Sequence, residues 1–212
     1  MRRTHHLIAF ASPLLVAVLA LGACASAGPP IHLHSLMPSQ LAPRSAAAAA
    51  EMVPIALEQV RLPAQVDQPQ WLVQLADGSL ASLEQDRWAS PLRDELRQAL
   101  LEELAVHAGA VEARGTAAGA TPPMRIGIDI RRFDSLPGRE ARIEGSWTLQ
   151  PGLSAGATTR CEWLYREAAS AGMAELAAAH RRAVIRLADG IGDGLLALRR
   201  GAPPQCPPSD PR

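Results

Sequence analysis

The sequence predicts an α+β domain in which a mostly antiparallel, mixed sheet of about five strands carries two main amphipathic helices. Two observations predict this class. Short segments alternate apolar and polar residues, and three of them follow one another between residues 124 and 167. Two longer segments, 90–109 and 173–200, repeat apolar residues at three- and four-residue steps. Because an apolar sheet face must be covered, we expect both helices to pack on one face.

Residues 1–23 have the organisation of an export signal. Two arginines precede an apolar stretch from Leu7 to Leu21. This stretch is shorter than the ~20 residues of a membrane-spanning helix, and Pro13 interrupts it, so a removed signal is favoured. The sequence Leu-Gly-Ala-Cys resembles a bacterial lipobox, which predicts a diacylglycerol on Cys24; an ordinary secretory signal with an incidental cysteine is the alternative. The residue after Cys24 is Ala25, and in this the sequence resembles lipoproteins that are sent to the outer membrane.

The rest of the chain divides into three parts. Residues 24–52 hold the lipid anchor, a first strand at "IHLH" and an Ala/Pro-rich tether, residues 53–201 form the domain, and residues 202–212 form a proline-rich tail. His32 and His34 share one face of the first strand, but two ligands without a third favour surface histidines over a metal site.

Two extended segments precede the first helix. Residues 53–63 alternate Val, Ile and Leu with smaller or polar residues, which predicts a half-buried strand ended by Pro63. The sequence "WLVQLADGSLASL" predicts two short strands joined by a turn at Asp77 and Gly78.

Each helix has its own signals. Ser90 can cap the first helix, Pro91 suits its first turn, and four leucines lie on one of its faces. These are Leu92, Leu96, Leu100 and Leu104. The second helix ends before Gly201. It contains "GIGDG", in which each glycine lowers helix stability by up to ~1 kcal/mol relative to alanine, so we expect these glycines where close packing requires them. A kink there is the alternative.

Three consecutive strands lie between the helices and predict an antiparallel meander with one buried face. The residues expected on that face are Ile126, Ile128, Ile130, Ile143, Trp147, Leu149, Cys161, Trp163 and Tyr165.

Composition excludes several classes of function. Removing residues 1–23 takes away two of the 21 basic residues and none of the 21 acidic ones, so the remaining net charge, about −2, does not favour nucleic acid. The chain contains no lysine and no asparagine, which excludes a Schiff-base amine or a phosphate-loop lysine. Its length suits one domain.

The two remaining cysteines suggest a disulfide. An exported protein meets oxidising conditions, so Cys161 and Cys206 can pair and tie the tail to the domain. In the alternative, Cys161 is a reduced strand residue and Cys206 is free or links two copies.

No catalytic, metal or cofactor site is predicted. "GLSAG" around Ser154 matches the G-x-S-x-G elbow of serine hydrolases, but it lies in a loop between strands rather than before a helix. The only histidine after it, His180, reads as a partly buried helix residue. "GIGDG" lies inside a helical pattern, which does not fit a dinucleotide-binding loop.

Residues 60–104 carry a more specific pattern. They resemble the ABC-type transport auxiliary lipoproteins, the PqiC-like family, in a "V-x-L-P-x-Y-L-D-R-P-Q-I-V-x-R" stretch and a following "R-W-A-x-P-L" stretch. The matching residues are Val60, Leu62, Pro63, Asp67, Pro69, Gln70, Val73, Arg87, Trp88, Ala89, Pro91 and Leu92. Gln65, Gln68 and Gln74 depart from the family pattern, which tends to show Tyr, Arg and Arg there.

The physical interpretation of this motif is structural. Pro63 and Pro69 would fix an extended approach to the hairpin, and Trp88 would anchor the helix start on the sheet. The resemblance implies anticodon-binding-like α/β layers and a periplasmic, outer-membrane-tethered accessory of a lipid-transport system. Its partners would be MCE-type proteins or ABC transporter components, with phospholipid handling and homo-oligomers as further options. A partner-binding envelope assembly or integrity lipoprotein without a lipid role is the alternative.

Overall fold

A computed structural model describes residues 28–38, 52–113, 122–152 and 157–211. Cys24, most of the predicted tether and Ser154 lie outside these residues. The chain divides after Pro30, and residues 31–212 are described here as one unit.

A five-stranded mixed sheet forms the centre of this unit, as the sequence predicted. Its order is β5-β2-β6-β7-β8. The strands are β2 (Val53–Arg61), β5 (Ala110–Glu112), β6 (Met124–Leu136), β7 (Glu140–Gln150) and β8 (Thr159–Ala168). The last three form the antiparallel meander, whereas β2 pairs in parallel with both β5 and β6. Parallel pairing is possible because α3 lies in the connection between β2 and these strands.

A second sheet of three strands accompanies the first and was not predicted. Its order is β1-β4-β3, and its strands are β1 (His32–His34), β3 (Gln70–Gln74) and β4 (Leu80–Trp88). The predicted hairpin is β3-β4, and β1 adds to it in parallel. The first strand, which the sequence placed with the tether, is therefore part of the same unit as the domain.

The segment between β2 and β3 explains the second sheet. We expected Pro63 and Pro69 to hold an extended segment, and this prediction was wrong. The Val66 amide donates to the carbonyl oxygen of Pro63 over 3.1 Å, so the chain turns there. Val66 is buried at this turn, which lies between β2 of the five-stranded sheet and β3 of the second sheet.

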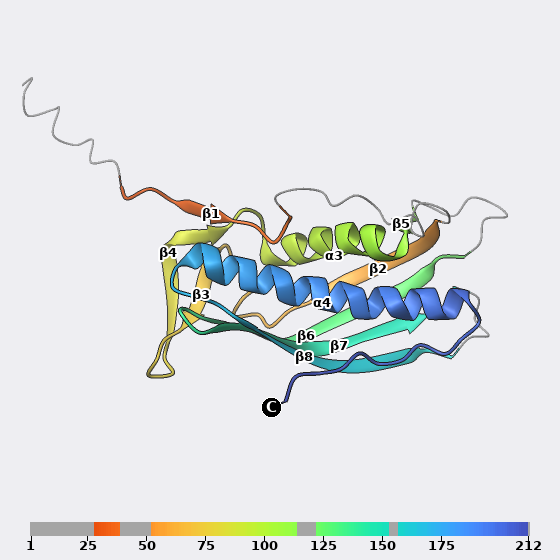
Figure 1. Cartoon of the computed structure of the whole chain (residues 1–212). Helices are drawn as coiled ribbons and strands as arrows, with labels where there is room; N and C mark the ends of the chain where they lie inside the picture. The colour runs from red at the N-terminus through yellow and green to blue at the C-terminus, as the bar shows by residue number, and fades with distance from the viewer. Residues whose placement is uncertain (1–27, 39–51, 114–121, 153–156, 212) are drawn as a thin grey trace, which may run out of the picture. The chain divides into compact units, whose positions relative to one another are not determined.

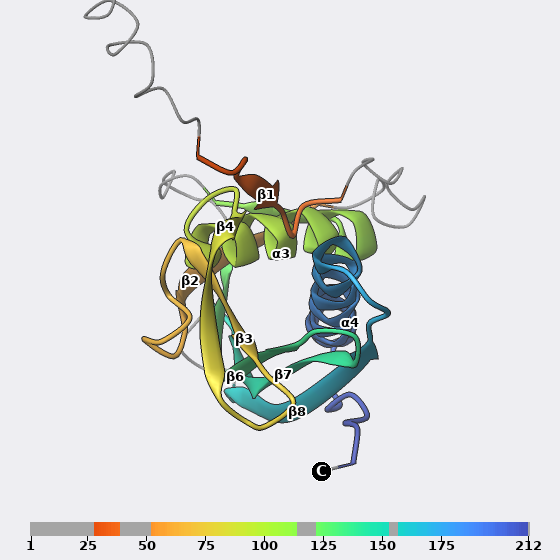
Figure 2. The ribbon, with the colours of Figure 1, turned by 90° about the vertical axis from the view of Figure 1, so that its left-hand side faces the viewer.

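Two helices cover one face of the five-stranded sheet, here called the inner face (Figures 1 and 2). They are α3 (Leu92–Ala108) and α4 (Met173–Arg199). The four predicted leucines of α3 are all fully buried. Ser90 was expected to cap α3, but Pro91 holds the N-cap position and makes no side-chain cap bond. The Ser90 hydroxyl instead donates to the Glu95 carboxylate over 2.9 Å.

The glycines of α4 are sites of close packing in an uninterrupted helix. A β-carbon on Gly194 would lie 2.8 Å from Cδ1 of Leu149, and one on Gly190 would lie 2.8 Å from Cγ of Pro207. Larger residues would therefore push α4 away from β7 and from the C-terminal tail.

Candidate functional site

The motif residues meet where the β3-β4 hairpin joins the start of α3. Trp88 is 4% exposed, and its ring lies 4.2 Å, centroid to centroid, from the ring of Trp71. The Trp88 amide also donates to the carbonyl oxygen of Pro69 over 3.3 Å. Pro91 accepts hydrogen bonds from the amides of Asp94 and Glu95 and so begins α3. These contacts connect the hairpin with the start of α3.

The charged motif residues hold neighbouring segments together. Asp67 forms an ion pair with Arg93 of α3, and Arg93 also donates to the carbonyl oxygen of Val60 over 3.1 Å. Gln70 lies opposite Arg87 in the β3-β4 ladder. Of the twelve matching residues, Asp67, Pro69, Ala89 and Pro91 are exposed, and they are the ones that a partner could reach.

A buried carboxylate that sequence reasoning missed supports the same junction. Glu95 is 4% exposed and accepts hydrogen bonds from the hydroxyls of Ser90 and Ser35 and, over 2.8 Å, from the amide of Leu36. These bonds attach the segment after β1 to α3. The sequence did indicate that this carboxylate could be buried, because Glu95 precedes Leu96 and so borders the leucine face of the helix.

His180 lies at the centre of a buried network. The Trp71 indole donates to the Ser135 hydroxyl over 2.8 Å, so that hydroxyl can donate its own proton to Nε2 of His180, also 2.8 Å away. The Phe133 ring stacks on the imidazole at 4.1 Å. We expected a partly buried residue, but His180 is fully buried. Burial lowers its pKa to about 3, so the imidazole is neutral at physiological pH.

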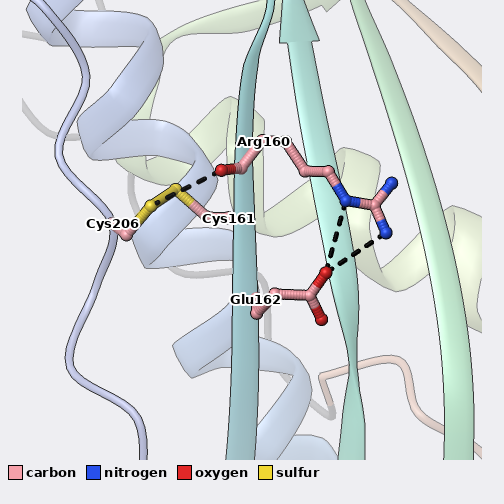
Figure 3. The surroundings of a disulfide bond; sticks show 4 residues. All are labelled: Arg160, Cys161, Glu162 and Cys206. Atoms are coloured by element: carbon pink, nitrogen blue, oxygen red, sulfur yellow. Dashed lines mark hydrogen bonds and ion pairs between the residues drawn. A yellow bond between two sulfur atoms is a disulfide. The ribbon is translucent and has the colours of Figure 1, made fainter.

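The C-terminal tail is fastened to the outer edge of β8. A disulfide joins Cys206 to Cys161 of that strand (Figure 3). Further along the tail, the Asp210 amide donates to the carbonyl oxygen of Leu164 over 2.9 Å, and the Leu164 amide donates to the Ser209 hydroxyl over 2.8 Å. The tail therefore covers a strand edge that would otherwise be open to pairing with another chain.

The tail also connects β8 with α4 through charge. Asp210 pairs with Arg186 at 2.8 Å, and the hydrogen bond from this guanidinium lowers the pKa of Asp210. The central carbon of the Arg186 guanidinium lies 4.3 Å from the centroid of the Tyr165 ring. Burial raises the pKa of Tyr165 to about 12.

An apolar groove of about 380 Å³ lies where α4 ends and β2 and β6 begin. Its lining is apolar except for one arginine: Met52, Val53, Pro54, Pro122, Met124, Pro151, Leu195, Leu198 and Arg199. Sequence reasoning did not find this groove, because it is made from four segments that are distant in the sequence.

The predicted histidine pair has a structural partner. Nε2 of His34 lies 2.8 Å from Oδ1 of Asp86, and Nδ1 of His32 lies 3.7 Å from the same oxygen. In the part of the chain that the structure describes, no group of three or more His, Cys, Asp or Glu side chains could hold a metal ion.

The family follows from a direct comparison. Residues 34–192 match the family model described as "ABC-type transport auxiliary lipoprotein component", so the chain belongs to this lipoprotein family. No curated protein sequence matches the chain. None of the helices among the described residues is long and apolar enough to cross a membrane.

Two solved structures share the fold. One is a crystal structure of an uncharacterized protein, with a TM-score of 0.62 and 17% identity, covering 77% of this chain and 97% of its own. The other is a Xanthomonas campestris protein of family DUF330, with a TM-score of 0.61 and 19% identity, covering 81% of this chain and 98% of its own.

Proposed function

We propose that this protein is a non-catalytic accessory of an ABC/MCE-type lipid transport system, anchored by Cys24 in the outer membrane and facing the periplasm. The observation that carries the proposal is the family match over residues 34–192, which agrees with the lipobox at the end of the export signal. Several acyl chains on Cys24, at ~0.8 kcal/mol per buried methylene, would hold the protein on the membrane.

A non-catalytic role is supported by the position of His180. A general base must reach the proton that it removes. His180 is fully buried and bonded to Ser135, so it is not available to substrate. We infer that the protein acts by docking onto MCE-type or transporter components.

Affinity isolation tests the partner. The full chain is extracted from membranes in mild detergent after chemical crosslinking, and co-isolated proteins are identified by mass spectrometry. We expect MCE or ABC transporter components. A Cys24→Ala chain with a cleavable secretory signal is the matched control, because it should fold alike, lose palmitate labelling and leave the membrane. Repeated recovery of other envelope proteins alone would contradict the proposal.

Lipid contact is tested separately with a photoactivatable phospholipid. The apolar groove is the described surface best suited to an acyl chain, since only Arg199 in its lining is charged. We expect labelled peptides from the groove and weaker labelling in Met52→Asp, which changes a side chain that is 74% exposed. Leu80→Asp, a change at the exposed hairpin turn, is the control. Absence of label would favour an envelope assembly or integrity role without lipid.

A further inference from the structure

A bulge in β6 directs two consecutive arginines to the outer face of the five-stranded sheet, the face opposite α3 and α4. The β6-β7 register shifts between Ile130 and Arg132, which leaves Arg131 as an extra residue. Ile130 and Phe133 are both buried on the inner face, while Arg131 and Arg132 between them are exposed. Bulges commonly redirect side chains near functional sites.

The neighbouring strands bring two more arginines to the same place. Arg142 of β7 lies directly opposite Arg166 of β8. Like charges in such a cross-strand pair are unfavourable unless an anion compensates them. The four arginines, together with Glu144 and Leu164, line a pocket of about 420 Å³.

The carboxylates of the described residues neutralise this pocket incompletely. Arg132 and Arg142 both donate to one oxygen of Asp134, over 2.9 and 2.5 Å. Arg131 pairs with Glu162 and lies 3.8 Å from Glu144. These three carboxylates therefore serve the guanidinium groups of Arg131, Arg132 and Arg142, and none of them forms an ion pair with Arg166.

Among the described residues, Arg166 is the arginine of the pocket that forms no ion pair. No carboxylate of a described residue lies within 4.0 Å of its guanidinium nitrogens, and its buried Nε has no hydrogen-bond partner there. Asp210 interacts with Arg166 electrostatically and accepts a hydrogen bond from its backbone amide, but its carboxylate is also bound by Arg186. An anion that bridges Arg166 and its neighbours would satisfy this donor.

We propose that the four-arginine pocket, formed by Arg131, Arg132, Arg142 and Arg166, binds a phosphate ester. Guanidinium groups bind phosphate through paired N–H donors, and several of them can serve several oxygens of one phosphate group. A carboxylate holds its two oxygens in one plane, whereas the oxygens of a phosphate group are arranged tetrahedrally and can face guanidinium groups on several sides. Leu164 supplies an apolar wall beside the ester carbons. The inference is independent of the docking partner, and a lipid headgroup or a free phosphate could supply the group.

Titration calorimetry of the full chain in a neutral detergent tests this inference. The probes are inorganic phosphate and dihexanoyl phosphatidylglycerol. We expect Arg166→Gln and Arg132→Gln to raise the Kd at least tenfold, and added NaCl to raise it in the unaltered chain. Arg125→Gln is the matched control. Arg125 is an exposed arginine of β6, the strand of Arg132, but it forms an ion pair with Glu58 outside the pocket. It should change the Kd less than twofold.

The two probes separate the sources of phosphate. Binding of the lipid alone supports a headgroup site, and similar binding of both supports recognition of the phosphate group by itself. The inference is overturned if neither probe binds at millimolar concentration, or if both pocket variants bind like the unaltered chain while their melting temperatures are unchanged. Tighter binding of a polyglutamate peptide than of either probe also overturns it. These results leave the partner isolation experiment unaffected, so the two proposals fail separately.

Discussion

The two faces of the five-stranded sheet differ in how they are held. On the inner face of β7, Trp147 and Leu149 are fully buried beneath the helices. On the outer face, Arg142 and Glu144 are half-buried and lie among ion pairs. The inner face is stabilised by apolar burial and close packing, whereas the outer face is stabilised by interactions that water and salt weaken. Stability therefore depends on the inner face, and the outer face can be used for binding.

The largest expected effect tests this difference on one strand. Trp147→Ala removes a fully buried ring, so we expect the free energy of unfolding to fall by about 3–5 kcal/mol. Thr148→Ala, the next residue on the outer face, should cost less than about 1 kcal/mol. Urea denaturation followed by fluorescence measures both. Similar losses for the two variants would mean that the faces do not differ as described.

The disulfide holds the tail against β8 and should have the second-largest effect. Cys161 and Cys206 are 45 residues apart, and removing a crosslink of that span costs about 4 kcal/mol in the chain-entropy description. Replacing both cysteines by serine should lower the melting temperature. A reducing agent should lower it in the unaltered chain and leave the double variant unchanged, which serves as the control. Equal melting temperatures for all samples would contradict this.

His180 should make the inner face sensitive to acid. Its pKa is about 3 in the folded protein, against the ordinary value of 6.5, so the unfolded chain binds the proton first as pH falls. Above about pH 6.5, this pKa difference does not reduce the free energy of unfolding. Between about pH 6.5 and pH 3, the free energy of unfolding falls by about 1.4 kcal/mol for each unit by which the pH is lowered. Urea denaturation from pH 7 to 4 measures this slope.

A His180→Leu chain provides the comparison for that slope. It keeps the other histidines and the carboxylates of the outer face, so their contributions cancel between the two proteins. The variant is expected to be less stable at pH 7 and to lose less stability on acidification. The same slope in both proteins would show that His180 does not control the acid response.

Much of the inner face could be predicted from the sequence, because alternation along a strand and four-residue spacing along a helix are local properties. Ile143 and Trp147 were predicted inward from β7 alone, and Leu92 and Leu96 from α3 alone. Pairing between distant segments is not local. Nothing in the sequence of β2 indicated its parallel pairing with β5 and β6, and the alternation in the hairpin did not indicate a separate sheet.

The outer face was harder to predict because its important feature is an irregularity. In "IDIRRF", Ile130 and Phe133 are three residues apart, which breaks the alternation and signals a bulge. The break leaves Arg131 and Arg132 together between two inward-facing residues. Arg142 and Arg166 could be added only once the register of β7 and β8 was known.

A substitution of Gly190 tests how much stability depends on the close packing of α4 against the tail. Alanine improves helix propensity by up to ~1 kcal/mol, but its β-carbon would lie 2.8 Å from Cγ of Pro207. Overpacking typically costs about 1–3 kcal/mol, so we expect Gly190→Ala to lose about 1 kcal/mol in net stability. Ala174→Gly, an exposed change in the same helix, measures the propensity effect alone. A rise in melting temperature for Gly190→Ala would show that the tail moves aside easily.

The smallest expected effect belongs to the ion pair between Arg125 and Glu58 on the outer face. Their side chains are 55% and 47% exposed, and such pairs contribute about 0–1 kcal/mol. A double-mutant cycle with Arg125→Gln and Glu58→Gln should give a coupling of about 0.5 kcal/mol or less, and 0.5 M NaCl should remove most of it. A coupling above about 2 kcal/mol would show that charges stabilise the outer face as packing stabilises the inner one. A small coupling means that arginines on this face can change partners at little cost, which is the property that an anion-binding surface requires.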